Sequence, residues 1–133
     1  MGIISQVFDL PRDLQPCDPV RSVYVECGLQ IGNSFTGALT KKFDRLYGIE
    51  INARNFDACV KRFGGDGVET CKFCGMRQER SIHLGSTIEL LPRILNPHRS
   101  TTIFLDSHWS EGPDDEMDDR YGQCPLIEEL RII

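Results

Sequence analysis

Residues 22–34 carry the sequence SVYVECGLQIGNS, in which a strand pattern is followed at once by a glycine turn. The β-branched and aromatic residues of 22–26 favour a strand, and Gly28 predicts the turn that ends it. Asn33 or Ser34 can cap a helix that follows. A strand that passes through a turn into a helix is half of a βαβ unit, so this stretch predicts an α/β fold.

The same alternation continues along the chain. Further strands are predicted at Arg45–Ile51, Arg80–Leu84 and Thr101–Asp106. Further helices are predicted to begin at Asn52, at Ser86 and at Cys124-Pro125, with Gly64-Gly65 ending the first of them and Pro92 inside the second. Strands that alternate with helices of this length predict a three-layer α/β sandwich with a mostly parallel sheet of about four strands.

Length and charge bound the class of protein. A chain of 133 residues predicts one domain, and its net charge of −5 argues against nucleic acid as a partner. The longest apolar runs are too short to cross a membrane, and the first residues do not resemble a secretory signal. We therefore expect a cytoplasmic protein with no nucleic-acid and no membrane partner.

Within the single domain, 1–133, three segments lack a clear period. We expect 1–20 to be an N-terminal extension, 66–79 to be an inserted loop and 107–123 to be an acidic loop. Six acidic residues fall within 111–119, a density that is typical of a solvated loop and that could also attract a cationic group.

Polar residues or glycines stand at the end of each predicted strand, where open α/β sheets bind ligands. Gly28 and Gly32 bracket the first turn, but the spacing is neither the dinucleotide fingerprint nor a phosphate-binding loop. Glu50 ends the second strand, where a carboxylate can accept both hydroxyls of a ribose. Asp106 and His108 follow the last strand and could converge on a proton, a metal or a charged group of a ligand.

These motifs, in this order, resemble the class I S-adenosylmethionine-dependent methyltransferases. The resemblance rests on Val23–Ser34, Tyr47–Ile51, Gly85–Pro92, Phe104–Ser110 and Cys124–Leu130, and it spans about residues 20–131. It implies a Rossmann-like sheet with the strand order 3-2-1-4 and S-adenosylmethionine as cofactor.

The resemblance also implies roles for single residues. Glu26, Gly28 and Gly32 would surround the methionine part of the cofactor, Glu50 would hold the ribose, and Gly85-Ser86 would lie near the adenine. The implied cofactor-binding set is Glu26, Cys27, Gly28, Gly32, Asn33, Glu50, Ile51, Gly85 and Ser86, and the implied catalytic pair is Asp106 and His108. The family usually has Gly-Asp where this chain has Gly85-Ser86, which removes one carboxylate from the adenine site.

The family's sheet has seven strands, whereas this chain predicts about four and so resembles a C-terminally shortened member. The fourth predicted strand would then lie at an exposed edge of the sheet. We expect a second copy of the chain to cover that edge, which makes a homodimer the simplest assembly.

Cys71 and Cys74 form a C-x-x-C pair of the kind that supplies half of a zinc site. Cys59 and His83 are the nearest candidates for the other half, and two ordinary thiols in a loop are the alternative. No metal site is assigned on this pattern.

Three functions fit the sequence. The first is methyl transfer from S-adenosylmethionine to an oxygen or nitrogen nucleophile of a small molecule. The second is a non-catalytic, methyltransferase-like binding or assembly module, and the third is a zinc-stabilised interaction domain.

Overall fold

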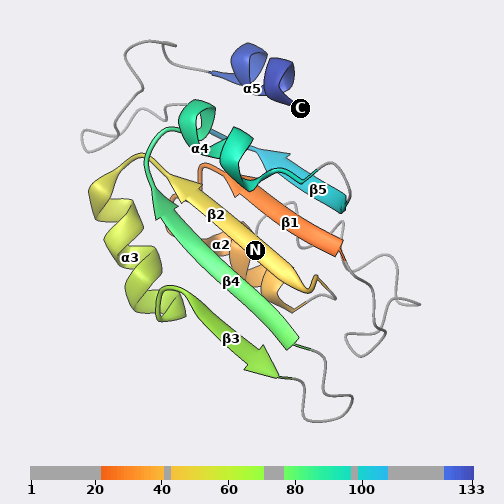
Figure 1. Ribbon diagram of the computed structural model, residues 1–133. Coiled ribbons are helices and arrows are strands. Elements are labelled where there is room, and N and C mark those ends of the chain that lie inside the picture. The colour runs from red at the N-terminus through yellow and green to blue at the C-terminus, as the bar shows by residue number, and fades with distance from the viewer. Residues whose placement is uncertain (1–21, 41–42, 71–76, 97–98, 108–124) are drawn as a thin grey trace.

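A five-stranded sheet organises the computed structural model of the chain (Figure 1). The structure describes residues 22–40, 43–70, 77–96, 99–107 and 125–133. The strands are β1 (Ser22–Cys27), β2 (Arg45–Glu50), β3 (Gly67–Thr70), β4 (Arg77–Leu84) and β5 (Ser100–Leu105). The helices are α2 (Asn33–Leu39), α3 (Ala53–Phe63), α4 (Thr87–Ile94) and α5 (Leu126–Ile132). The predicted α/β fold is confirmed.

The sheet is mixed, and its strand order is β3-β4-β2-β1-β5. Strands β4, β2, β1 and β5 pair in parallel, whereas β3 pairs antiparallel with β4. The sheet therefore has one strand more than expected, and its full strand order differs because β3 is added outside β4, whereas the four predicted strands keep the expected order 3-2-1-4. The difference arises in 66–79, which was interpreted as a loop: it holds β3 and the first residues of β4, and residues 71–76 lie outside the described part.

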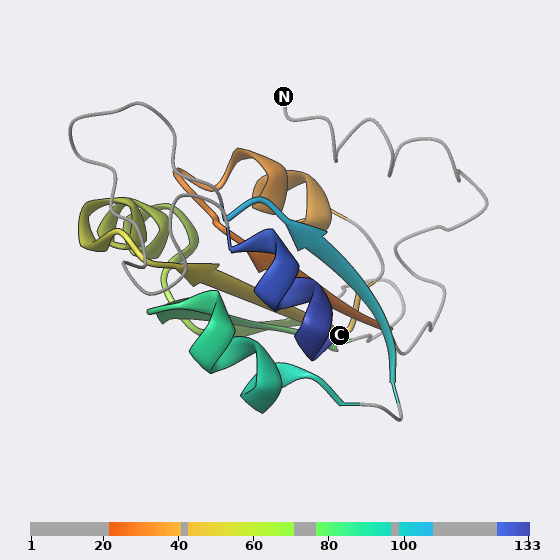
Figure 2. The same ribbon diagram turned by 90° about the horizontal axis from the view of Figure 1, so that it is seen from above.

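Two apolar layers pack on opposite faces of the sheet, because neighbouring side chains of a strand point to opposite sides. Tyr24 and Leu46 belong to the cluster that packs against α2 and α3. Val25 and Ile49 belong to the cluster that packs against α4 and includes Ile132 of α5. Figure 2 shows the sheet between these two pairs of helices, which is the predicted three-layer arrangement.

The helix starts agree only in part with the sequence. The Asn52 side chain caps α3 by accepting a 2.9 Å hydrogen bond from Asn55 N, and Gly64 ends that helix with φ +77°. The residue before α2 is Gly32, with φ +85°, so the expected cap by Asn33 or Ser34 is wrong. Ser86 precedes α4 as expected, but its hydroxyl makes no capping hydrogen bond.

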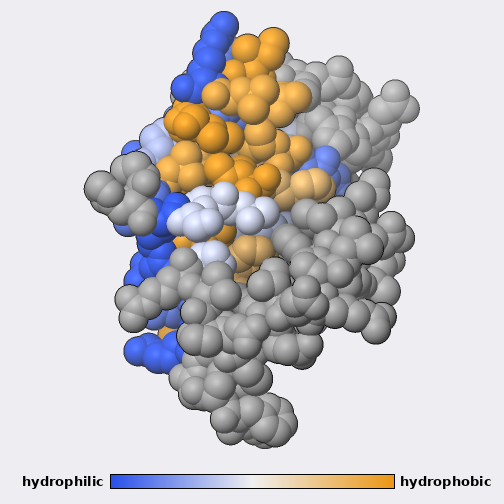
Figure 3. Space-filling model, turned by 90° about the vertical axis from the view of Figure 1, so that its right-hand side faces the viewer, coloured by the Kyte–Doolittle hydropathy of each residue, from blue (hydrophilic) through white to orange (hydrophobic). Residues whose placement is uncertain are grey.

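Strand β5 lies at one edge of the sheet, next to β1. Figure 3 shows apolar side chains gathered on this side of the molecule, over α5 and β5. The exposed members on α5 and beyond its end are Leu126, Ile127, Leu130 and Ile133. None of the helices in the described ranges is long and apolar enough to cross a membrane.

Candidate functional site

The carboxyl ends of the parallel strands are joined by backbone hydrogen bonds into one edge. Gly28 N donates to Ile49 O at 2.9 Å, which joins the turn after β1 to β2. Gly85 N donates to Glu50 O at 2.9 Å, and Asp106 N donates to Cys27 O at 2.8 Å. The segments that follow β1, β2, β4 and β5 therefore meet at this edge, where the sequence predicts a ligand site.

The turn after β1 is shaped by three residues with left-handed backbone. Their φ angles are +86° at Gly28, +51° at Gln30 and +85° at Gly32. A Cβ on Gly28 would lie 2.3 Å from Asp106 O, and a Cβ on Gly32 would lie 2.5 Å from the Phe63 ring. Both glycines are thus required by close packing against the protein itself, a role that the sequence pattern alone does not distinguish from ligand binding.

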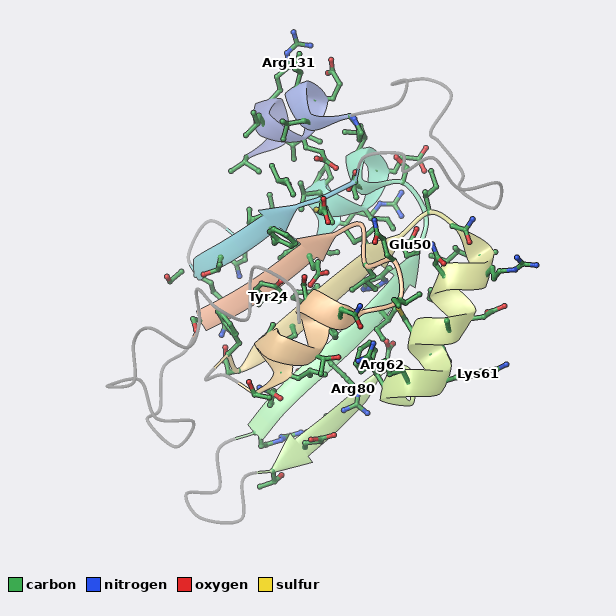
Figure 4. All side chains as sticks on the ribbon, turned by 180° about the vertical axis from the view of Figure 1, so that it is seen from behind. Tyr24, Glu50, Lys61, Arg62, Arg80 and Arg131 are labelled. Atoms are coloured by element: carbon green, nitrogen blue, oxygen red, sulfur yellow. The ribbon has the colours of Figure 1, made fainter. Side chains whose placement is uncertain are left out.

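Two backbone N–H groups hold the Glu50 carboxylate at the centre of this edge. Gln30 N donates to Oε2 at 2.5 Å, and Asn52 N donates to Oε1 at 2.9 Å. The side chain is only 5% exposed. Figure 4 shows Glu50 at the end of β2, beside the start of α3. Each carboxylate oxygen has two lone pairs, so a group held in this way can also accept hydroxyl hydrogens from a ligand.

Glu26 is a second buried carboxyl near the same edge. Its Oε2 accepts a 2.8 Å hydrogen bond from the Tyr24 hydroxyl, and the residue is 2% exposed. Burial, opposed by the hydrogen bond from Tyr24 and helped by the charges of Asp106 and Glu50, raises the pKa of Glu26 to about 8. Three acidic residues thus share one electrostatic environment, which favours a cationic ligand.

Two hydroxyls at this edge lack a hydrogen-bond partner. Ser86 Oγ, before α4, and Ser107 Oγ, after β5, are buried and accept or donate no hydrogen bond within the described residues. Buried hydroxyls are nearly always satisfied, so these two atoms are suited to a ligand. Asp106, directly before Ser107, is half-buried, whereas His108 lies outside the described residues.

The other expected cofactor residues are placed less centrally. The Cys27 side chain packs in the cluster beneath α4, and burial raises the pKa of its thiol. Asn33 is exposed, and its Oδ1 accepts a 2.9 Å hydrogen bond from Arg62. Ile51 is half-buried after β2, and Gly85 links β4 to Ser86. These four residues therefore lie beside the edge. None of them offers a ligand a polar side chain that lacks another contact among the described residues.

Several contacts at the site were not predicted. Arg62, on α3, also donates to Ile31 O at 2.9 Å, which joins that helix to the first turn. The Cys59 thiol donates to Gln30 O at 3.1 Å, and burial raises its pKa to about 12. Thr87 donates to the buried carboxyl of Glu129, so α5 is tied to the start of α4. The sequence gives no signal for these contacts, because Arg62 has the position of any exposed residue on a helix.

The structure holds no group of three or more His, Cys, Asp or Glu side chains that could bind a metal, within the ranges described above. Glu26, Glu50 and Asp106 are near one another without forming such a group. Cys71 and Cys74, the two cysteines of the possible zinc half-site, lie outside the described residues.

Comparisons with known proteins support the fold. No family model matches the sequence, and no curated protein matches it. Among solved structures, the chain is similar to a "putative RNA methyltransferase" from Pyrococcus horikoshii, with a TM-score of 0.51 and 18% sequence identity. The match covers 97% of this chain and 54% of that chain, so this chain spans about half the length of that protein. The fold is methyltransferase-like.

This likeness overturns one expectation. The acidic net charge and the acidic loop led us to expect a small-molecule substrate and no nucleic acid, whereas the similar protein is described as a "putative RNA methyltransferase". The prediction that nucleic acid is not a partner is therefore wrong. Net charge is a sum over the whole chain, and it does not report how positive charge is distributed over the surface.

Proposed function

We propose that the chain binds S-adenosylmethionine at the carboxyl edge of its sheet and methylates RNA. The observation that carries the proposal is the Glu50 carboxylate, held by Gln30 N and Asn52 N at the end of β2 beside the turn after β1. The fold is similar to that of a protein described as a "putative RNA methyltransferase", which supports this interpretation of the edge.

The residues at the edge fit this cofactor in charge and in hydrogen bonding. Glu50 would accept the two ribose hydroxyls, and the free hydroxyls of Ser86 and Ser107 would meet polar atoms of the ligand. A carboxyl environment made by Glu26, Glu50 and Asp106 suits a cation, and S-adenosylmethionine carries a positive sulfonium. Ser86 would provide a hydroxyl where the family usually has a carboxylate.

When bound, the cofactor would supply an electrophilic methyl carbon attached to its sulfonium sulfur. The protein's task is then to align a nucleophile with that carbon and to exclude water. Asp106 directly follows β5 and is joined through its backbone to Cys27 before the first turn, so its carboxylate would accept the proton that an oxygen or nitrogen nucleophile gives up on methylation. His108 remains a second candidate for the same role from the sequence.

Two measurements test the proposal in order. Calorimetric titration with S-adenosylhomocysteine should give saturable binding, and Glu50→Gln should weaken it at least about tenfold, because an amide cannot accept from both backbone N–H groups and two hydroxyls. Asp57→Asn, a carboxyl-to-amide change on the exposed surface of α3, should leave binding unchanged. Thermal unfolding of each variant shows whether a loss of binding reflects a loss of fold.

Methyl transfer is tested with radiolabelled S-adenosylmethionine and an unmodified RNA transcript, with DNA of the same sequence as the control. Label should be incorporated into RNA in preference to DNA. No binding of S-adenosylhomocysteine at millimolar concentration would refute the cofactor assignment. Binding without transfer to RNA would refute the transferase assignment and would favour the binding-module alternative.

A further inference from the structure

A cavity of about 340 Å³ lies at the opposite end of the sheet from Glu50. It opens between the first residues of β1 and β2 and the last turn of α4. The residues that line it are Val23, Arg45, Tyr47, Arg93, Ile94, Leu95, Asn96 and Arg99. Because β1 and β2 each have six residues, this cavity is separated from the carboxyl edge by about 20 Å of strand.

Three guanidinium groups from three different segments converge on this cavity, and no carboxylate of the described residues lines it. Arg45 is the first residue of β2, Arg93 belongs to the last turn of α4, and Arg99 directly precedes β5. The separation of these residues in sequence means that the fold, and not a local run of basic residues, brings them together.

Nearby carboxylates offset part of this charge. Arg99 is paired with Asp44, and both side chains are about one-fifth exposed. Arg45 Nε lies 3.7 Å from Glu79 Oε2, which is a long ion pair between half-exposed side chains. Arg93 makes no hydrogen bond or ion pair with the residues that the structure describes. Within the described part of the chain, three positive charges thus face two negative ones, and Arg93 has no charged partner.

The rest of the lining suits a ligand with a planar or apolar part. The Tyr47 ring forms one wall, stacked on the His83 ring at a centroid distance of 6.3 Å. Val23, Ile94 and Leu95 supply apolar surface, and the Asn96 side chain adds an amide. A cation in the last turn of a helix also stabilises the helix dipole, which would explain Arg93 alone but not the convergence of Arg45 and Arg99.

We propose that this cavity binds the phosphate group of a nucleotide, either a free nucleotide or one unit of an RNA strand. Guanidinium groups are the side chains best suited to phosphate, and the apolar wall accommodates the sugar and base. The site does not depend on the proposed methyl transfer, since it uses none of the residues at the carboxyl edge.

The test measures binding of a fluorescein-labelled oligouridylate by anisotropy, with unlabelled uridine 5′-monophosphate and uridine as competitors. Arg93→Gln and Arg45→Gln should each weaken binding about fivefold to tenfold and lower the salt dependence by about one ion. Lys61→Gln is the matched control, because Lys61 is an exposed cation on α3, which covers the other face of the sheet (Figure 4). It should bind as the wild type does.

The competitors identify the source of the phosphate. Stronger competition by the monophosphate than by uridine supports the site. A higher affinity for the oligonucleotide than for the monophosphate would identify an RNA strand as the ligand, and equal affinities would identify a free nucleotide. Equal competition by uridine and its monophosphate would overturn the proposal, as would wild-type binding by both arginine variants. Absence of binding to the wild-type protein would overturn it too.

Amide chemical shifts of the wild-type protein give a measurement that needs no variant. Uridine 5′-monophosphate should shift residues 45–47 and 93–96. Shifts confined to 27–32 and 50–52 would instead place the nucleotide at the carboxyl edge and would refute the site.

Discussion

The Tyr24 hydroxyl donates a 2.8 Å hydrogen bond to Glu26 Oε2, and both side chains lie on the same face of β1. Both are buried, in a strand that is covered on its two faces. Burial raises the pKa of each of them above its ordinary value, with Glu26 at about 8. At neutral pH the pair is therefore a tyrosine bonded to a carboxyl group that has kept its proton.

This pair makes the stability of the protein depend on pH. The folded state holds the Glu26 proton more tightly than the unfolded state, so unfolding releases a proton between about pH 4.5 and pH 8. The contribution of Glu26 to stability is complete below about pH 4.5 and is lost as the pH rises through 8. At its steepest, the free energy of unfolding should fall by about 1.4 kcal/mol per pH unit from this group.

Glu26→Gln should flatten that fall, because an amide does not titrate in this range. Urea unfolding at intervals from pH 5 to pH 9 gives the difference between variant and wild type. Asp57→Asn, on the exposed surface of α3, should follow the wild-type curve. Parallel curves for Glu26→Gln and the wild type would contradict the raised pKa.

The same carboxyl makes cofactor binding depend on pH, if the proposed function is correct. A sulfonium near Glu26 favours its charged form, so binding of S-adenosylmethionine should release a proton. Affinity should then rise between pH 6 and pH 8, by up to about tenfold per pH unit. S-adenosylhomocysteine has a neutral sulfur and should lack this slope, and calorimetry of both ligands checks the difference. Equal slopes for the two ligands would contradict this account.

Gly28→Ala should destabilise the fold strongly. The new Cβ would lie 2.3 Å from Asp106 O, on a backbone with φ +86°, so the turn and the end of β5 would have to separate. We expect a loss of roughly 2–4 kcal/mol. Gly65→Ala separates the two causes, because Gly65 has φ +72° but its nearest neighbour would be 3.9 Å away.

The Gly65 variant should lose only about 1 kcal/mol, the ordinary cost of a left-handed alanine. Chemical unfolding of both variants measures the two losses. Similar losses would mean that backbone strain alone explains Gly28 and that the contact with Asp106 contributes little.

Thr87→Val should loosen α5. The Thr87 hydroxyl donates to the Glu129 carboxyl, which is 1% exposed, so its removal leaves a buried acceptor without that donor. A loss of about 2 kcal/mol is expected, with faster amide exchange across 126–132. Thr87→Val combined with Glu129→Met removes both polar groups and should recover most of the loss. An additive double variant would show that the two side chains do not act together.

The sequence predicted the parts of the fold that have a clear apolar or capping pattern. Strand β1 and the last strand are apolar, and α3 has a capping Asn52 and a terminal Gly64 that both act as expected. Strand β3 was missed because its four residues are mostly exposed, and so they need no apolar alternation. The first half of β4 was missed because Arg77, Gln78 and Glu79 lie on a partly covered flank of the sheet, where polar side chains are tolerated.

The site was predicted as a set of strand ends, and its internal contacts were not. Parallel strands bring Glu50 and Asp106 to one edge by topology alone, which the alternation of elements already implies. No sequence pattern predicts the left-handed backbone of Gln30 or the hydrogen bond of the Tyr24 hydroxyl. Each of these features depends on contact with another residue. The partner of Gln30 is Glu50, which the pairing of β1 with β2 brings close, and the partner of Tyr24 is Glu26, two residues along the same strand.

The two backbone donors of Glu50 have a kinetic consequence. Gln30 N and Asn52 N fix the carboxylate before any ligand arrives, and Gly28 fixes the turn against the end of β5. A ligand that docks here meets groups already in place and does not have to order them. Stopped-flow association should therefore be a single phase whose rate rises linearly with ligand concentration, whereas a site assembled on contact would level off at the rate of its own rearrangement.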